Sequence, residues 1–218
     1  MTNARLIRPV VLTALVVAAS AMMAGFGGVP RLRPGQAAPA LALVDTTGTS
    51  HTLSSYRGRT VVLEWIDTSC PVVTRLHRSG LVQASKEAAR AIDPTVVWLS
   101  VNSTSGTDVS TNDRWIRDMK ASSPVLLDAD GSAARSFGVR STAHYFVIDA
   151  KGRVVYHGAL DDDRTGKKAE RGEVVVRYVV DAVRASAAQS PMKPFSVQPY
   201  GSPIRVASPP ESKKGASA

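Results

Sequence analysis

Two nearly uninterrupted apolar segments constrain the fold of this chain more than any other feature of its sequence. They lie at residues 60–66 (TVVLEWI) and 96–101 (VVWLSV). Short apolar runs rich in β-branched residues are typical of strands buried on both faces of a sheet. A helical segment at residues 71–91, interrupted near Ser79 and Gly80, connects them. This order predicts two parallel strands joined by a crossover helix, and therefore an α/β domain.

Shorter elements complete the pattern on both sides of this unit. Two short strands, at residues 41–45 and 51–53, precede it. After it we expect helices over residues 111–121 and 132–137, a strand at 124–127, a hairpin of 145–148 and 153–157, and a closing helix over 173–188. The order predicts a mixed central sheet flanked by helices, with an N-terminal β-hairpin as an extension.

The composition excludes several classes of protein. The 218 residues are 44% hydrophobic and 21% charged, with a single cysteine. The apolar content is too high for a disordered protein, and one cysteine rules out a disulfide-stabilised miniprotein or a cysteine-rich zinc site. The formal net charge is +9. Because the basic residues are scattered and form no dense patch, we expect no nucleic-acid partner.

The N-terminus has the pattern of an export segment. Arg5 and Arg8 precede residues 9–29, which carry no charge, and Ala19-Ser20-Ala21 matches a small-residue cleavage site. We therefore expect a secretory signal peptide and a location outside the cytoplasmic membrane. The alternative is an uncleaved anchor that associates with the membrane, because the uncharged stretch reaches the roughly 20 residues that a span requires.

These features predict the organisation of the whole chain. Residues 1–29 are a signal peptide or an N-terminal membrane anchor, and residues 30–39 are a linker. One domain covers residues 40–189. The proline-rich residues 190–206 form a C-terminal extension, and residues 207–218 form a disordered tail.

The cysteine lies where the first buried strand gives way to a helix. Asp67, Thr68 and Ser69 form the connecting loop, and Pro71 suits the first helical turn, where its missing N–H has no partner to lose. A thiolate at a helix N-terminus faces unpaired backbone N–H groups and the positive end of the helix dipole. Such settings lower the pKa of a cysteine to about 3.5–7.5. We interpret Cys70 as a reactive thiol; the alternative is a small structural residue of the core.

Glu64 interrupts the first apolar strand, where an unpaired carboxylate would be costly. The alternation of a strand places it on the same face as Ile66. Two roles remain open for it. It could accept the proton of the Cys70 thiol, with a pKa raised by burial, or it could be a carboxylate at a sheet edge paired with an arginine.

Short motifs between residues 35 and 206 occur in an order that matches a known family. They are Gly35-Gln36-Ala37-Ala38-Pro39, Leu43-Val44-Asp45, Gly48, Tyr56-Arg57-Gly58-Arg59, Val61-Val62-Leu63, Glu64-Trp65, Cys70-Pro71-Val72-Val73, His144-Tyr145-Phe146-Val147-Ile148-Asp149 and Pro199-Tyr200-Gly201. Together they resemble the redoxin domains, thioredoxin-fold proteins related to alkyl hydroperoxide reductases and thiol-specific antioxidants. The EW…CP pattern resembles one exported branch of that family.

The resemblance implies a thioredoxin fold and an exported thiol oxidoreductase of antioxidant type, in which Cys70 attacks a peroxide or a disulfide. It implies that Glu64, six residues before the nucleophile, takes up the thiol proton. It also implies that the C-terminal extension packs near the active site, because the exported branch carries a cysteine directly after the Pro-Tyr-Gly element.

Three positions depart from the family pattern. Val73 stands where a dithiol motif has its second cysteine, Ala143 stands at the place of the cis-proline opposite the thiol, and Ser202 stands at the place of the C-terminal cysteine. With no second thiol in the chain, turnover of an oxidised Cys70 requires an external thiol reductant. The alternative function is a degenerate, catalytically inactive thioredoxin-fold binding module.

The four histidines do not form a metal-binding pattern. His77 follows Cys70 by two helical turns, or roughly 10 Å, which disfavours direct base catalysis. In a thioredoxin fold His144 would lie nearer the thiol, whereas we expect His51 and His157 at the surface. We therefore expect no metal ion and no other cofactor.

Overall fold

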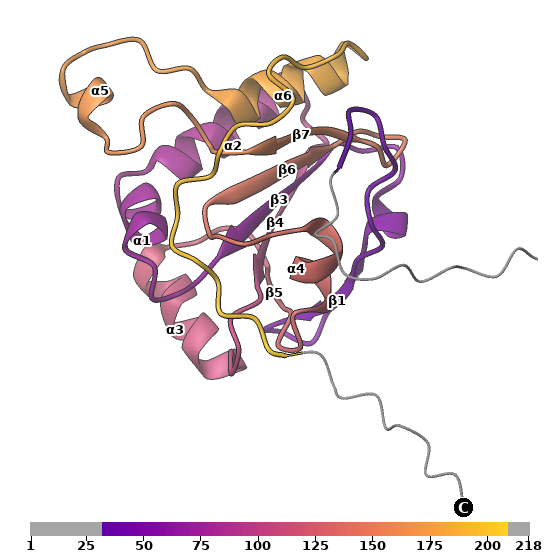
Figure 1. Ribbon diagram of the computed structural model, residues 1–218, viewed down its shortest axis with the longest axis vertical. Coiled ribbons are helices and arrows are strands. Elements are labelled where there is room, and N and C mark those ends of the chain that lie inside the picture. Colours follow the sequence, from indigo (N-terminus) through magenta and orange to yellow (C-terminus); the bar gives the residue numbers. More distant parts are fainter. Residues whose placement is uncertain (1–31, 209–218) are drawn as a thin grey trace, which may run out of the picture.

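A seven-stranded mixed sheet forms the centre of the structure (Figure 1), with the strand order β2-β1-β5-β4-β3-β6-β7. The computed structural model describes residues 32–208. The predicted signal peptide or anchor, and all but two residues of the predicted tail, lie outside this part of the chain. No helix within residues 32–208 is long and apolar enough to cross a membrane.

The elements follow the predicted order closely. The strands are β1 Ala42–Asp45, β2 Ser50–Thr52, β3 Val61–Ile66, β4 Val97–Asn102, β5 Val125–Leu127, β6 His144–Ile148 and β7 Val154–Gly158. The helices are α1 Pro71–Arg78, α2 Leu81–Ile92, α3 Val109–Met119, α4 Ser132–Phe137, α5 Lys167–Glu170 and α6 Tyr178–Ala187, with a 3-10 helix η1 at Leu53–Tyr56. The predicted fold class, α/β with a mixed central sheet flanked by helices and an N-terminal hairpin, is confirmed.

The two apolar segments are the central parallel strands. β3 pairs in parallel with β4 and antiparallel with β6, and every residue of β3 is buried. Val62 and Ile66 face a core shared with α1, α2, α3 and α6, whereas Leu63 and Trp65 face a core shared with α4. Glu64 therefore points into the first of these cores, which also contains Cys70.

The predicted helical interruption is real. α1 ends before Gly80, which has a φ of 75° and begins α2. This left-handed conformation suits glycine, because a side chain would be strained there. The break limits α1 to eight residues.

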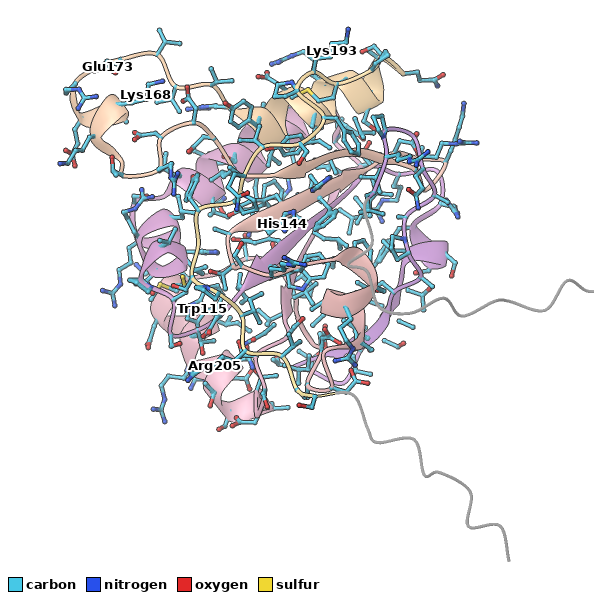
Figure 2. All side chains as sticks on the ribbon, viewed as in Figure 1. Trp115, His144, Lys168, Glu173, Lys193 and Arg205 are labelled. Carbon is cyan, nitrogen blue, oxygen red and sulfur yellow. The ribbon has the colours of Figure 1, made fainter. Side chains whose placement is uncertain are left out.

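The closing helix is shorter than the sequence predicts. α6 begins at Tyr178, not near residue 173. The Asp162 carboxylate accepts a hydrogen bond from the Val176 N–H at 3.0 Å and ties this stretch to the preceding loop. Val174 is 86% exposed, so the stretch offers no apolar face that helix formation would bury. Figure 2 shows Lys168 and Glu173 on the α5 loop at the edge of the molecule.

Part of the predicted linker, residues 30–39, packs alongside the β6–β7 hairpin. The Gly35 N–H donates to the Val154 carbonyl at 3.0 Å, and the Ala38 N–H donates to the Gly152 carbonyl at 2.9 Å. This stretch is therefore held as an additional extended segment at the edge of the sheet.

Residues 195–206, which we name the C-terminal strap, return from α6 across the molecule (yellow trace in Figure 1). The His157 N–H on β7 donates to the Phe195 carbonyl at 3.1 Å. Farther along, Pro203 forms an antiparallel bridge with Ser141. The strap is thus attached to the domain both before and after position 202.

Candidate active site

The loop between β3 and α1 is shaped by one aspartate. The Asp67 carboxylate accepts hydrogen bonds from the Ser69 backbone N–H at 2.8 Å and from its hydroxyl at 2.7 Å. The Cys70 N–H donates to the Asp67 carbonyl at 3.0 Å. Thr68 is half-buried and Pro71 is the exposed first residue of α1. The loop therefore fixes Cys70 as the residue that caps the helix N-terminus.

Two hydroxyl groups contact the thiol. Thr142 Oγ1 donates to Cys70 Sγ at 3.0 Å, and Sγ donates to Ser202 Oγ at 3.2 Å. Cys70 is 2% exposed and Thr142 is fully buried. Ser202 was predicted from the sequence, but Thr142 was not. The signal that could have revealed it is its place directly before Ala143, opposite the thiol.

These contacts favour the ionised sulfur. Burial by itself raises the pKa of the Cys70 thiol. Hydrogen bonds with the Ser202 and Thr142 hydroxyls and with the Val73 backbone outweigh it, so the pKa lies below its ordinary value. Once Sγ has lost its proton, the Ser202 hydroxyl can reverse its hydrogen bond and donate to the sulfur.

Ala143 gives the neighbouring backbone an unusual conformation. Its φ is 50°, and its N–H donates to the Trp65 carbonyl at 2.9 Å. A proline could neither adopt this φ nor make this hydrogen bond. The departure from the family pattern therefore has a physical consequence. Ala143 holds the chain against β3 by a backbone hydrogen bond that a proline could not donate. The preceding residue, Thr142, lies beside Cys70.

Glu64 is fully occupied by other partners. Its carboxylate accepts hydrogen bonds from Tyr145 Oη at 2.9 Å, Trp98 Nε1 at 3.2 Å and Ser100 Oγ at 3.3 Å, and lies 2.9 Å from His77 Nε2. Cys70 is not among these partners.

The expectation of a raised pKa for Glu64 is wrong. Burial raises the pKa of this carboxyl, but the charge and hydrogen bond of His77 outweigh it, and the pKa falls to about 2. The expected pairing with an arginine at a sheet edge is also wrong, because the partner is His77 and β3 is an interior strand. The role of proton acceptor stays a prediction.

The other histidines lie away from the thiol. His144, which is labelled in Figure 2, lies in the interior of the domain. Its ring stacks on Phe146, and its Nε2 lies 3.2 Å from Nδ1 of the half-buried His157. Burial and the proximity of His157 lower the pKa of His144 to about 3, so its ring is neutral at physiological pH. His51 is buried between Asp45 and Tyr56, which contradicts its predicted surface position.

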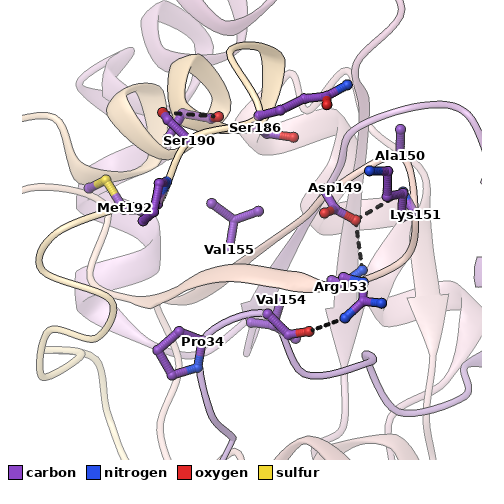
Figure 3. A pocket seen from close by; sticks show the side chains of 14 residues that line it. Pro34, Asp149, Ala150, Lys151, Arg153, Val154, Val155, Ser186, Ser190 and Met192 are labelled. Atoms are coloured by element: carbon purple, nitrogen blue, oxygen red, sulfur yellow. Dashed lines mark hydrogen bonds between the residues drawn. The ribbon is translucent and has the colours of Figure 1, made fainter.

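No three metal-ligating side chains gather in the described part of the chain. A cavity of about 530 Å³ lies elsewhere, between the β6–β7 turn and the end of α6 (Figure 3). Asp149, Arg153, Val155 and Met192 are among its lining residues, and Cys70 is not. The buried Cys70 thiol therefore lies outside this cavity.

A thiol at the start of the helix that follows a central strand, within this sheet, defines a thioredoxin-like protein. Solved structures with this fold include a hypothetical protein from Sinorhizobium meliloti 1021 (23% identity, 82% of this chain and 97% of that chain, TM-score 0.67). A putative protein disulfide isomerase from Bacteroides thetaiotaomicron (16%, 72% and 91%, 0.57) and Peroxidoxin BcpB from Mycobacterium tuberculosis (18%, 71% and 98%, 0.54) are also similar. At these identities the likeness establishes the fold.

The Redoxin family profile matches residues 33–175, more than half of the chain. The chain therefore belongs to the redoxin family, whose members are thioredoxin-like thiol oxidoreductases. The matched region contains Cys70 and Thr142 and ends before the C-terminal strap. No curated protein matches the chain.

Proposed function

We propose that this protein is an exported thiol oxidoreductase of the redoxin type in which Cys70 is the nucleophile. The observation that carries the proposal is the position of its sulfur, at the N-terminus of α1 and within hydrogen-bond distance of the Thr142 and Ser202 hydroxyls. Both features stabilise a thiolate, which is the nucleophilic form of cysteine.

The substrate is a peroxide or a disulfide. With a peroxide, the thiolate attacks one oxygen: a sulfur–oxygen bond forms, the oxygen–oxygen bond breaks, and the leaving oxyanion takes up a proton. Sulfur is oxidised by two electrons to a sulfenic acid while the peroxide is reduced. With a disulfide, attack forms a mixed disulfide and releases a thiolate.

Recycling then needs a partner thiol. After reaction with a peroxide, a first external thiol condenses with the sulfenic acid to a mixed disulfide, releasing water, and a second thiol attacks that disulfide and frees Cys70. After reaction with a disulfide, one external thiol attacks the mixed disulfide and frees Cys70. Val73 and Ser202 cannot do this, because neither carries a sulfur. We propose that Asp67, Thr68, Ser69 and Pro71 hold the thiol in place during these steps.

Intact mass spectrometry of the purified protein tests the chemistry directly. After brief treatment with hydrogen peroxide, we expect one added oxygen that dimedone traps on the Cys70 peptide. After prolonged treatment with oxidised glutathione, we expect a glutathione adduct that a reducing thiol removes. Cys70→Ser is the control and should gain neither label. A wild-type thiol that stays unmodified under both treatments would favour the inactive binding module.

The proposed location is outside the cytoplasmic membrane, with residues 1–29 as a signal peptide or an anchor. The support is the charge pattern around Arg5 and Arg8 and the Ala19-Ser20-Ala21 site. Cell fractionation should find the protein outside the cytoplasm or on the outer face of the membrane. A full-length soluble pool in the cytoplasm would refute export.

A further inference from the structure

The C-terminal strap covers the thiol that the proposed function uses. Cys70 is 2% exposed, although it lies in a loop at the end of a strand. The strap closes the site with a main-chain hydrogen bond, from the Thr142 N–H to the Ser202 carbonyl at 2.9 Å, beside the contact between Ser202 Oγ and Sγ. The strap therefore forms part of the cover over the sulfur.

The strap is fastened on both sides of Ser202. Before it, the buried Tyr200 hydroxyl donates to Asp161 Oδ1 at 2.7 Å. After it, the Ile204 N–H donates to the Arg140 carbonyl at 3.0 Å. These contacts hold the covering segment at two points only a few residues apart, which leaves it little freedom to swing away.

Gly201 shows how closely the strap approaches the domain. A Cβ atom built at this position would lie 2.2 Å from the Thr142 carbonyl oxygen and 2.4 Å from its carbonyl carbon. Those atoms belong to the backbone and cannot rotate aside. Any residue larger than glycine would force the strap and Thr142 apart, directly above the thiol.

We propose that the strap is a size filter that makes Cys70 selective for small hydroperoxides over disulfides. This inference rests on the proposed nucleophilic role of Cys70 and narrows its substrate. Hydrogen peroxide has two heavy atoms and needs only a narrow opening. A disulfide carries a substituent on each sulfur and must approach along the line of the bond that breaks, which requires displacement of the strap.

The same cover acts on the product. A sulfenic acid at Cys70 lies between the Thr142 and Ser202 hydroxyls, and an external thiol must pass the strap to reach it. The strap therefore slows reduction as well as entry of disulfides, and the oxidised form persists until the strap opens.

Thiol probes of two sizes test the filter without relying on catalysis. The small probe is methyl methanethiosulfonate and the large probe is 5,5′-dithiobis(2-nitrobenzoic acid), and both react with any accessible thiolate. For the wild-type protein, we expect the ratio of small-probe to large-probe rate constants to exceed that of free cysteine by about tenfold or more. Gly201→Ala should bring the ratio close to that of free cysteine.

A second strap variant keeps the test valid if Gly201→Ala does not fold. Tyr200→Phe removes the bond to Asp161 but keeps the ring, and should accelerate the large probe by about tenfold. Tyr178→Phe removes an α6 hydroxyl that makes no hydrogen bond with the strap, so it is the matched control and should change neither rate. Circular dichroism and the thiol pKa are measured for each variant, so that rates are compared per thiolate.

The outcomes separate the two claims. A wild-type ratio equal to that of free cysteine, or an unchanged ratio in both strap variants, would overturn the filter. Lack of reaction with hydrogen peroxide alone, with the probe ratios as expected, would overturn the selectivity for hydroperoxides. Lack of reaction with both hydrogen peroxide and oxidised glutathione would overturn the proposed function and leave the cover in place.

Discussion

At the scale of single residues, the proposed mechanism relies on two hydroxyls rather than on a second sulfur. Thr142 and Ser202 contact Cys70 Sγ from the β6 side and from the strap. Each can stabilise negative charge on sulfur, but neither can form a disulfide. In the proposed mechanism, the residues that activate the thiol are therefore distinct from the external thiol that reduces it.

Glu64 and His77 form a buried ion pair on the side of the sheet whose core contains Cys70. Glu64→Gln tests how much this pair contributes to stability. Loss of the buried charge should lower the free energy of unfolding by about 3 kcal/mol, because His77 and the surrounding donors lose their charged partner. Urea unfolding measures this, with the exposed Glu170→Gln as the control.

Alkylation of Cys70 in the same variant separates the two roles. If Glu64 also accepts the thiol proton, the rate near neutral pH falls in Glu64→Gln. Lower stability with an unchanged rate would assign Glu64 a structural role, whereas unchanged stability would contradict the importance of the pair.

At the scale of elements, the sequence predicts those strands and helices whose positions depend on the local hydrophobic pattern. Strands β3 and β4 and the broken helix between them follow from residues 60–101, since apolar runs and Gly80 act locally. The start of α6 could not be predicted from the pattern. The Val176 N–H donates a hydrogen bond to the Asp162 carboxylate, and this long-range contact keeps the preceding stretch out of the helix. The same applies to Thr142, whose role arises from a contact with Cys70 across 72 positions of the chain.

The docking of the strap beside α1 predicts a new disulfide. Ser202→Cys should join Cys70 under mild oxidation, because Ser202 Oγ already lies 3.2 Å from Sγ. Mass spectrometry should find a monomer that has lost two hydrogen atoms and has no free thiol. The matched control is Ser196→Cys, on the exposed part of the strap, which should keep both thiols. Two titratable thiols in oxidised Ser202→Cys would show that the strap is not docked in solution.

At the scale of the whole molecule, two buried networks lie on opposite faces of the sheet. Glu64 and His77 belong to the core that contains Cys70, whereas His144 packs with Phe146 in the other core. The alternation of side chains along β3 and β6 predicts that Glu64 and His144 lie on opposite faces of the sheet. It does not reveal that His144 meets His157, because that pairing depends on the register of the hairpin.

The buried neutral His144 predicts loss of stability in mild acid. Its pKa is about 3 in the folded protein, against 6.5 for an ordinary histidine. As the pH falls below 6.5, the unfolded chain binds a proton that the folded chain refuses, so the free energy of unfolding decreases until about pH 3. The lowered pKa of His157 acts in the same direction.

Denaturant unfolding between pH 7 and 5 measures this effect apart from the contribution of Glu64. Glu64, with a pKa lowered from 4.5 to about 2, contributes stability that is lost only below about pH 4.5. His144→Phe should reduce the slope of stability against pH in the upper range. A slope equal to that of the wild type would show that folding does not lower the pKa of His144.

The central claim, that the fold makes Cys70 a thiolate nucleophile, is tested most directly by the rate of its alkylation against pH. With iodoacetamide, we predict a midpoint clearly below the value of about 8.5 for free cysteine. Thr142→Val should raise this midpoint by about one pH unit, because one hydrogen bond to the ionised sulfur is lost. A wild-type midpoint at or above about 8.5 would contradict the account and mark Cys70 as a buried structural residue.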